Sequence, residues 1–310
     1  MLEPMADSER EALLPPPAPA PPVLATAPAA SPVTLTLPFK PPYDWDALIG
    51  FLGPRAIPGV ECVRSGQYLR TIALGDARGW ISVRPAESPA ALLATIQFPH
   101  PAALPLIAGR IRHLFDLDAD PALIAAKLSA DPMMARLVAA RPGLRVPGAW
   151  DAFELAVRAI LGQQVSVARA TILAGKLVAL SGTALKLPSG AGFDGLTHLF
   201  PRPAAVAAVA DPKTPPGVAM GVALGMPRAR AASITALAQA VGADPDLLAP
   251  AETLDRSVAR LRALPGIGEW TAQYIAMRAL HWPDAFPHSD IGLIRALQTG
   301  DRRPTPEEVL

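Results

Sequence analysis

The sequence predicts an α+β protein in which an N-terminal domain of strands and helices precedes an all-α core. Strand-like alternation is confined to about residues 33–98, whereas the chain after Arg110 consists of helix-like segments that Pro and Gly interrupt. Hydrophobic residues make up 51% of the 310 residues, which is enough to bury a sizeable core. Short helices with short connections indicate a helical core of about 150 residues.

Residues 1–36 are predicted to form a disordered or polyproline-like tail. Residues 1–42 hold 12 of the 37 prolines, mixed with Ala, and such a segment neither packs a core nor donates ladder hydrogen bonds. From Val33 onward VTLTL alternates apolar residues with Thr, which favours a strand.

An N-terminal α+β domain is expected over residues 37–119. Its expected elements are a short helix at 46–52 and strands at 67–74, 79–83 and 92–98. A central helical domain is expected at 145–280, and a C-terminal helical subdomain at 120–144 together with 281–310. The expected helices from residue 104 onward are 104–116, 121–128, 131–140, 151–163, 166–180, 203–209, 229–240, 255–263, 269–280 and 290–297.

Charge and cysteine usage exclude several classes of function. The 28 basic and 27 acidic residues give a net charge of +1, which excludes bulk polyelectrolyte binding of nucleic acid but not a local contact. The single cysteine, Cys62, excludes an intramolecular disulfide, an iron–sulfur cluster and a thiolate zinc site. We find neither a long uninterrupted apolar run nor a basic-then-apolar start, so we expect no membrane span, no secretory signal and a cytoplasmic location.

The most specific stretch is LRALPGIGEWTA at residues 261–272, which predicts two helices joined by a Pro-Gly-x-Gly turn. Pro265 ends the first helix, while Gly266 and Gly268 permit backbone angles and close approaches that a side chain would block. The first N–H groups of the second helix lack partners within the helix and can bind a phosphate oxygen. Such a hairpin grips a nucleic-acid backbone without reading bases, although a turn made only for packing is the alternative.

Three further residues near this hairpin are candidates for a site. Trp270 and Tyr274 lie on one face of the second helix, either as core residues or as a stacking platform that attracts a cationic, methylated purine. Asp290 follows Gly268 by 22 residues and directly precedes an apolar helix. By itself this position predicts an N-cap aspartate, which can still project into a cleft.

The sequence resembles the helix-hairpin-helix DNA glycosylases of base-excision repair, and within them most closely the bacterial inducible 3-methyladenine DNA glycosylase II family. The resemblance covers about residues 37–300. It rests on LPGIGEWTAQYIAMRAL (264–280), FPHSDIGLIRAL (286–297), PPYDWDALIGFLGPRAIPGVE (41–61), RHLFDLDADP (112–121), RPGLRVPGAWDAFELAVRAILGQQVSVARA (141–170) and LGMPRARAASI (224–234).

The resemblance implies that Asp290 is the sole catalytic carboxylate of an enzyme that cleaves the N-glycosidic bond of alkylated purines, such as 3-methyladenine and 7-methylguanine. It would stabilise the oxocarbenium-like sugar or orient the attacking water. One carboxylate suffices because the leaving base is already cationic and needs little general-acid help. The implied partner is double-stranded DNA with alkylated bases. The protein is expected to bind it as a monomer and to have no membrane partner.

The resemblance also assigns the surrounding residues. Trp270 stands where bifunctional relatives carry a Schiff-base Lys, so no lyase activity is expected. The implied base pocket consists of Trp270, Tyr274 and Phe51. The implied DNA contacts are Gly266, Ile267, Gly268, Thr271, Gln163 and Gln164. Among these, Gln164 is the wedge that fills the space vacated by the flipped base. No cofactor and no side-chain metal ligand are implied, apart from a structural monovalent cation on backbone carbonyls near Leu264 and Ile267.

The resemblance stops short at the C-terminus. Relatives continue past the helix that follows the aspartate with a basic, Trp-rich helix that closes the core, whereas this sequence stops 20 residues after Asp290. We therefore expect a truncated C-terminal end, which leaves three hypotheses open. They are an active glycosylase, a catalytically impaired module that binds alkylated DNA, and a helical scaffold whose hairpin holds a protein partner.

Overall fold

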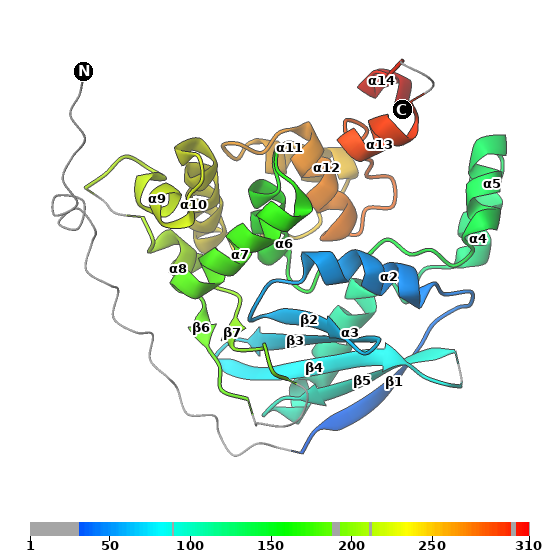
Figure 1. Cartoon of the computed structure of the whole chain (residues 1–310), viewed down its shortest axis with the longest axis horizontal. Coiled ribbons are helices and arrows are strands. Elements are labelled where there is room, and N and C mark those ends of the chain that lie inside the picture. Colours follow the sequence, from blue (N-terminus) through cyan, green and yellow to red (C-terminus); the bar gives the residue numbers. More distant parts are fainter. Residues whose placement is uncertain (1–30, 89, 188–192, 211–212, 299–301, 310) are drawn as a thin grey trace.

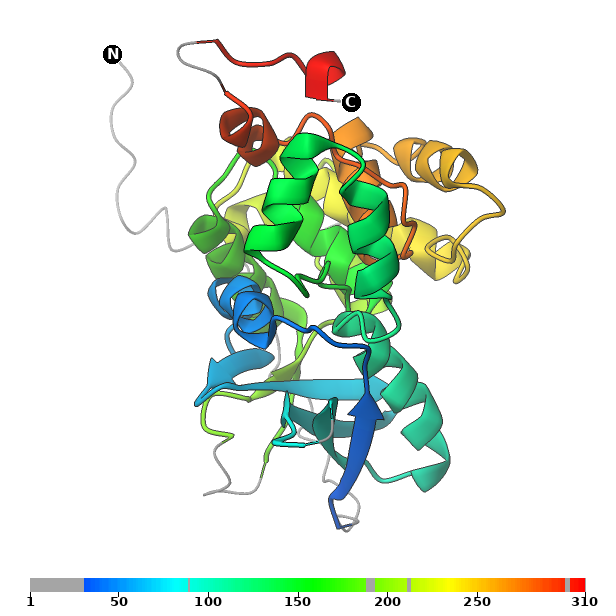
Figure 2. The ribbon, with the colours of Figure 1, turned by 90° about the vertical axis from the view of Figure 1, so that its right-hand side faces the viewer.

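The computed structural model describes residues 31–88, 90–187, 193–210, 213–298 and 302–309, whose arrangement Figures 1 and 2 show from two sides. A strand-rich part lies beneath a helical part in both views, which confirms the predicted α+β class. Most of the predicted tail lies outside the described residues. Its predicted boundary at residue 36 is wrong, because β1 already begins at Val33 and pairs with the sheet.

A five-stranded antiparallel sheet with the order β1-β5-β4-β3-β2 forms the N-terminal part. Its strands are β1 (Val33–Pro38), β2 (Glu61–Arg64), β3 (Gln67–Leu74), β4 (Ala77–Pro85) and β5 (Ala91–Gln97). Two-residue turns join β2 to β3 and β3 to β4, and their residues Ser65, Gly66 and Gly75 have the positive φ that such tight turns require. The sequence did not predict β2, because charged residues at both of its ends hide its pattern.

Two helices supply the remaining apolar surface of this domain. α2 (Trp45–Leu52) lies between the sheet and the helical part in both views, and α3 (Leu104–Leu114) packs on the same core. The Asp44 side chain caps α2 by accepting the Ala47 N–H, and the 3-10 turn η1 (Gly53–Arg55) follows directly. A second 3-10 turn, η2 (Pro101–Ala103), leads into α3. The helix α2 is therefore the part of this domain that faces the helical core.

A second core lies among the helices, and Ile57 and Val60, from the segment before β2, also pack in it; a two-residue ladder joins β6 (Thr183–Ala184) to β7 (His198–Leu199). Its helices are α6 (Ala152–Leu161), α7 (Val167–Ser181), α8 (Pro203–Ala207), α9 (Val218–Leu224), α10 (Arg228–Ala243), α11 (Leu254–Arg262) and α12 (Glu269–Arg278). The predicted helices are confirmed to within a few residues at their ends. The sequence did not predict α9, which glycines flank in left-handed conformations at both ends.

The segments expected to form a C-terminal subdomain lie in two places. α4 (Pro121–Leu128) and α5 (Pro132–Ala140) project from one side of the molecule, apart from α13 (Ile291–Ala296) and α14 (Pro306–Val309) in Figure 1. None of the residues of α4, α5 or α13 is buried. Among the described residues, no helix is both long and apolar enough to cross a membrane.

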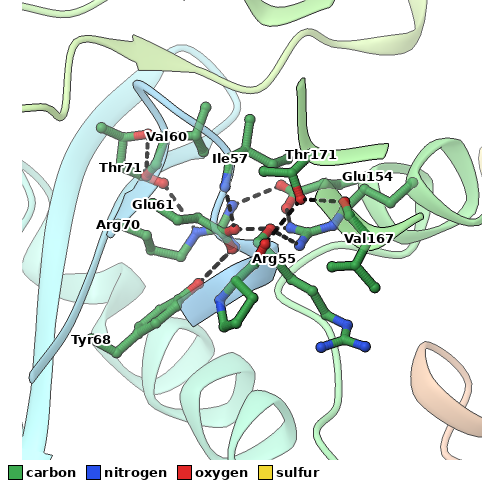
Figure 3. Close-up of polar contacts among 12 residues, drawn as sticks. Arg55, Ile57, Val60, Glu61, Tyr68, Arg70, Thr71, Glu154, Val167 and Thr171 are labelled. Carbon is green, nitrogen blue, oxygen red and sulfur yellow. Dashed lines mark hydrogen bonds and ion pairs between the residues drawn. The ribbon is translucent and has the colours of Figure 1, made fainter. Parts of the chain in front are cut away.

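Three buried charged side chains and a partly buried one join the sheet to the helical core, and we call these four the buried ion network. They are Glu61 of β2, Arg70 of β3, and Glu154 and Arg158 of α6. Arg70 bridges Glu61 at 3.0 Å and Glu154 at 2.7 Å, while Arg158 contacts the same two carboxylates at 2.9 and 3.2 Å. Figure 3 shows the Arg70 side of this arrangement. Each acid therefore lies between two cations.

Further hydrogen bonds complete the shell around Glu61. The Tyr68 hydroxyl donates to it at 2.6 Å and the Ile57 N–H at 3.1 Å, as Figure 3 shows. Burial alone would raise the pKa of Glu61, but Arg158 and Arg70 outweigh burial and lower it to about 2. The carboxylate is therefore charged at neutral pH and fully paired.

We predict that Arg70→Met lowers the free energy of unfolding by about 3–5 kcal/mol, because it leaves two buried carboxylates with a single cation. Urea denaturation followed by circular dichroism would measure this. Arg256→Met is the matched control, since it removes only an exposed pair with Glu252 and should cost less than about 1 kcal/mol. Equal stability of the two variants would contradict the structural role of the network.

A pair of histidines gives a pH-dependent contribution at the same junction. The ring of His113, on α3, lies 3.9 Å from that of His281, which follows α12. Burial first, and then His281, lower the pKa of His113 to about 4. The imidazole of His113 is therefore neutral in the folded state at neutral pH.

Between pH 6.5 and 4 the unfolded chain binds a proton at His113 that the folded chain does not. We therefore expect this group to stabilise the fold above pH 6.5 and to lose that stabilisation as the pH falls to 4. Because the ring is partly exposed, the loss should amount to about 1–2 kcal/mol. Urea denaturation at several pH values should give a flatter profile for His113→Gln than for the wild type, and parallel profiles would refute this.

Candidate active site

The hairpin between α11 and α12 is held by a glycine that no other residue can replace without strain. Gly266 has φ +79°, and a Cβ atom there would lie 1.9 Å from Oγ of Ser233 on α10. Gly268 instead has extended backbone and is the N-cap of α12, where no side chain caps the helix. The first N–H groups of α12 are thus without a side-chain acceptor and can serve an anion.

Gln163, which follows α6, braces this hairpin from the side. Its Nε2 donates to the Gly266 carbonyl at 2.9 Å and to Oγ1 of Thr271 at 3.0 Å. The side chains of Thr271 and Ile267 are buried, so only their backbone atoms could reach a ligand. Of the six residues that the sequence predicts to contact DNA, Gly266, Gly268 and Gln164 are exposed, and the contact itself stays a prediction for all six.

Gln164 has an unusual backbone. It lies in the turn between α6 and α7 with φ +56°, a left-handed conformation that costs energy for a residue with a side chain. Its side chain is exposed, in contrast to that of its neighbour Gln163. Strain of this kind is typical of sites where function fixes the direction of a side chain.

Asp290 combines the two roles that its position in the sequence allows. Its Oδ1 caps α13 by accepting the N–H groups of Gly292 at 2.7 Å and Leu293 at 3.3 Å. Its Oδ2 accepts the indole N–H of Trp270 at 2.8 Å. The half-buried carboxylate is therefore fixed at the start of one helix and turned toward the aromatic face of another.

The predicted aromatic residues are brought together at this point. The rings of Trp270 and Tyr274 stack with centroids 5.1 Å apart and an angle of 14° between them, and both are only partly buried. Phe51 reaches the same place from α2, because Arg278 donates to the Tyr274 hydroxyl at 2.6 Å and its Cζ lies 4.9 Å from the Phe51 ring. Tyr274 also packs against the helical core, so both rings lie partly exposed at its edge, and their use as a stacking platform stays a prediction.

Arg278 was not predicted from the sequence, although it is central to this arrangement. Its Nε donates to the Pro147 carbonyl at 2.6 Å and its Nη2 to the Gly148 carbonyl at 2.9 Å, while Nη1 holds Tyr274. Its spacing of i, i+4 from Tyr274 was the one available signal. Burial raises the pKa of Tyr274, but Arg278, Arg158 and Arg55 outweigh burial and leave this pKa below its usual value.

A metal site of acidic, histidine or cysteine side chains is not found among the described residues. The backbone carbonyls predicted to hold a monovalent cation lie in the turn of the hairpin. The Leu264 carbonyl already accepts the Ile267 N–H at 3.2 Å, a long hydrogen bond that leaves its second lone pair for an ion. The geometry of the turn is thus compatible with such an ion.

Comparisons with known proteins identify relatives of the chain. The AlkA N-terminal domain family matches residues 34–151. DNA-3-methyladenine glycosylase 2 of Escherichia coli (strain K12) is 38% identical over 259 residues, which cover 82% of this chain and 84% of that protein. The "probable bifunctional transcriptional activator/DNA repair enzyme AlkA" of Mycobacterium tuberculosis is 41% identical over 271 residues, or 87% of this chain. The chain spans about half, 51%, of the length of that protein.

The fold has a solved counterpart as well. A 3-methyladenine DNA-glycosylase from Archaeoglobus fulgidus superimposes with a TM-score of 0.73 at 21% identity, covering 89% of this chain and 90% of that one. At this identity the likeness establishes the fold and no more. It includes both the sheet and the helical core, since it spans most of the chain.

The two hairpin glycines provide a matched test of the turn. Gly266→Ala should lower the free energy of unfolding by about 2 kcal/mol or more, because it combines a positive φ with a clash against Ser233. Gly268→Ala, where nothing lies within 4 Å of the added Cβ, should cost less than about 1 kcal/mol. Thermal and urea unfolding of both variants would measure these losses of stability. A larger loss in Gly268→Ala than in Gly266→Ala would contradict the described turn.

Proposed function

Because this chain belongs to the DNA-3-methyladenine glycosylase 2 family, we propose that it is a monofunctional DNA glycosylase that releases alkylated purines of the 3-methyladenine and 7-methylguanine type. This reaction is the first step of base-excision repair. The observation that carries the proposal is the carboxylate of Asp290, which α13 and the indole of Trp270 hold beside the aromatic platform. The proposed partner is double-stranded DNA with an alkylated base, bound by a monomer.

The chemistry needs one fixed negative charge. When the N-glycosidic bond breaks, positive charge develops on the sugar, and a carboxylate about 3–4 Å away stabilises it strongly in a cleft with little water. Asp290 could also orient the water that attacks the sugar. A base alkylated at a ring nitrogen leaves as a neutral molecule, so it needs little protonation. Hydrogen bonds to both oxygens of Asp290 hold the carboxylate in one orientation before substrate arrives.

The target base must leave the duplex to reach this carboxylate. In the proposed complex the base stacks on Trp270 and Tyr274 beside Phe51, while the exposed side chain of Gln164 fills the space left in the duplex. The position of Trp270 also supports hydrolysis without a lyase step, since an indole cannot form a Schiff base with the sugar.

The hairpin would hold the DNA strand by its backbone. N–H groups at the start of α12, beyond Gly266 and Gly268, are the proposed phosphate ligands, and such contacts position a strand without reading sequence. A monovalent cation on the carbonyls near Leu264 and Ile267 would add positive charge beside that phosphate. No other cofactor is part of the proposal.

Asp290→Asn tests the proposal, because the amide keeps the shape of the carboxylate but removes its charge. We expect release of 3-methyladenine from methylated duplex DNA to fall by about 100-fold or more, with DNA affinity retained. Asp284→Asn is the matched control, since this exposed acid lies in the same loop and should keep full activity.

Full base release by Asp290→Asn would refute the assignment of the carboxylate. A wild-type protein that binds methylated DNA but releases no base would instead be the non-catalytic binding module. A wild-type protein without salt-dependent DNA binding would exclude both functions.

A further inference from the structure

Two guanidinium groups lie against the aromatic residues of the site without a carboxylate to balance them. Cζ of Arg55, at the end of η1, lies 3.7 Å from the centroid of the Phe51 ring, and Cζ of Arg278 lies 4.9 Å from it. Arg278 also lies 5.4 Å from the Tyr274 ring. Within the part of the chain that the structure describes, neither arginine forms an ion pair, whereas the four members of the buried ion network pair with one another.

The site is consequently polarised from one side to the other. The Trp270 end carries the negative charge of Asp290, which the indole N–H contacts directly. The Phe51 end carries two positive charges, those of Arg278 and Arg55, which together with Arg158 lower the pKa of the Tyr274 hydroxyl. A flipped base would lie in this gradient of potential.

A ring that already faces a guanidinium attracts a second cation less strongly. The negative face of an aromatic ring is what attracts a positive base, and Arg55 occupies that face of Phe51 at short range. Its charge also repels a cationic base directly, and a neutral base of the same shape lacks this charge–charge repulsion. The expected preference of the aromatic residues for cationic bases is therefore weaker at Phe51.

We infer that Arg55 is a specificity-determining residue, whose unbalanced charge beneath Phe51 lowers the preference for positively charged bases over neutral ones of similar shape. The inference rests on the proposed glycosylase function. Arg55 is the informative position of the two arginines, because the Arg278 side chain bonds two backbone carbonyls and a hydroxyl that hold the fold. Among the described residues, the Arg55 side chain bonds only the Phe51 carbonyl, at 3.0 Å, and it is partly exposed.

The test compares two 6-oxopurines in one duplex, each opposite cytosine: 7-methylguanine, which is cationic, and hypoxanthine, which is neutral. In Arg55→Gln the ratio of kcat/KM for 7-methylguanine to that for hypoxanthine should rise about 3- to 10-fold over the wild type. Arg55→Lys keeps the charge and should stay within about 2-fold. Because the two kcat/KM values are measured on one preparation, a loss of folded protein cancels in their ratio. Arg55→Met is a second variant that lacks the charge.

Arg84→Gln is the control for a general loss of positive charge, since Arg84 is exposed on β4 and its side chain bonds the neighbouring Pro85 carbonyl. It should change both substrates equally. An unchanged ratio in both charge-free variants, or an equal rise in Arg55→Lys, overturns the inference while leaving the glycosylase function intact. A wild-type protein that releases neither base overturns the proposed function, and this inference with it.

Discussion

The ion pairs between Arg70 and the carboxylates of Glu61 and Glu154 are the constraint on which the rest of the structure depends. They are buried at the junction of two separate apolar cores, one under the sheet and one among the helices. Charges at such a depth are stable only as a complete set, since removal of one partner leaves another unpaired in a medium of low polarity. The network therefore fixes the relative position of the two cores rather than adding greatly to their stability.

That relative position decides whether a site exists at all. Phe51 belongs to α2 and Arg55 to η1, whereas Trp270, Tyr274 and Arg278 belong to α12. Arg158 of α6, a member of the buried ion network, donates to the Arg55 carbonyl at 2.5 Å and so ties η1 to a helix of the helical core. The positions of Phe51 and Arg55 therefore depend on a contact that lies some distance from the carboxylate of Asp290.

Sequence patterns predicted what is local in this fold. An Asp before a Pro marks the starts of α4 and α5, and in both helices that Asp accepts two backbone N–H groups. Asp290 is recognisable as a helix cap for the same reason. The strand β2 and the helix α9 were not predicted. Ion pairing of Glu61 and close packing around Gly217 stabilise these two elements against their local sequence patterns. The two carbonyl partners of Arg278 lie 130 and 131 positions earlier in the chain, and no short motif encodes them.

The adjacency of Gln163 and Gln164 has a consequence for how the protein would hold DNA. Gln163 is bonded to the turn that would hold the strand, and Gln164 presents an exposed side chain from a strained backbone. In the proposed function, the residue that fills the vacated space in the duplex would therefore be joined directly to the residue that supports the hairpin on the strand.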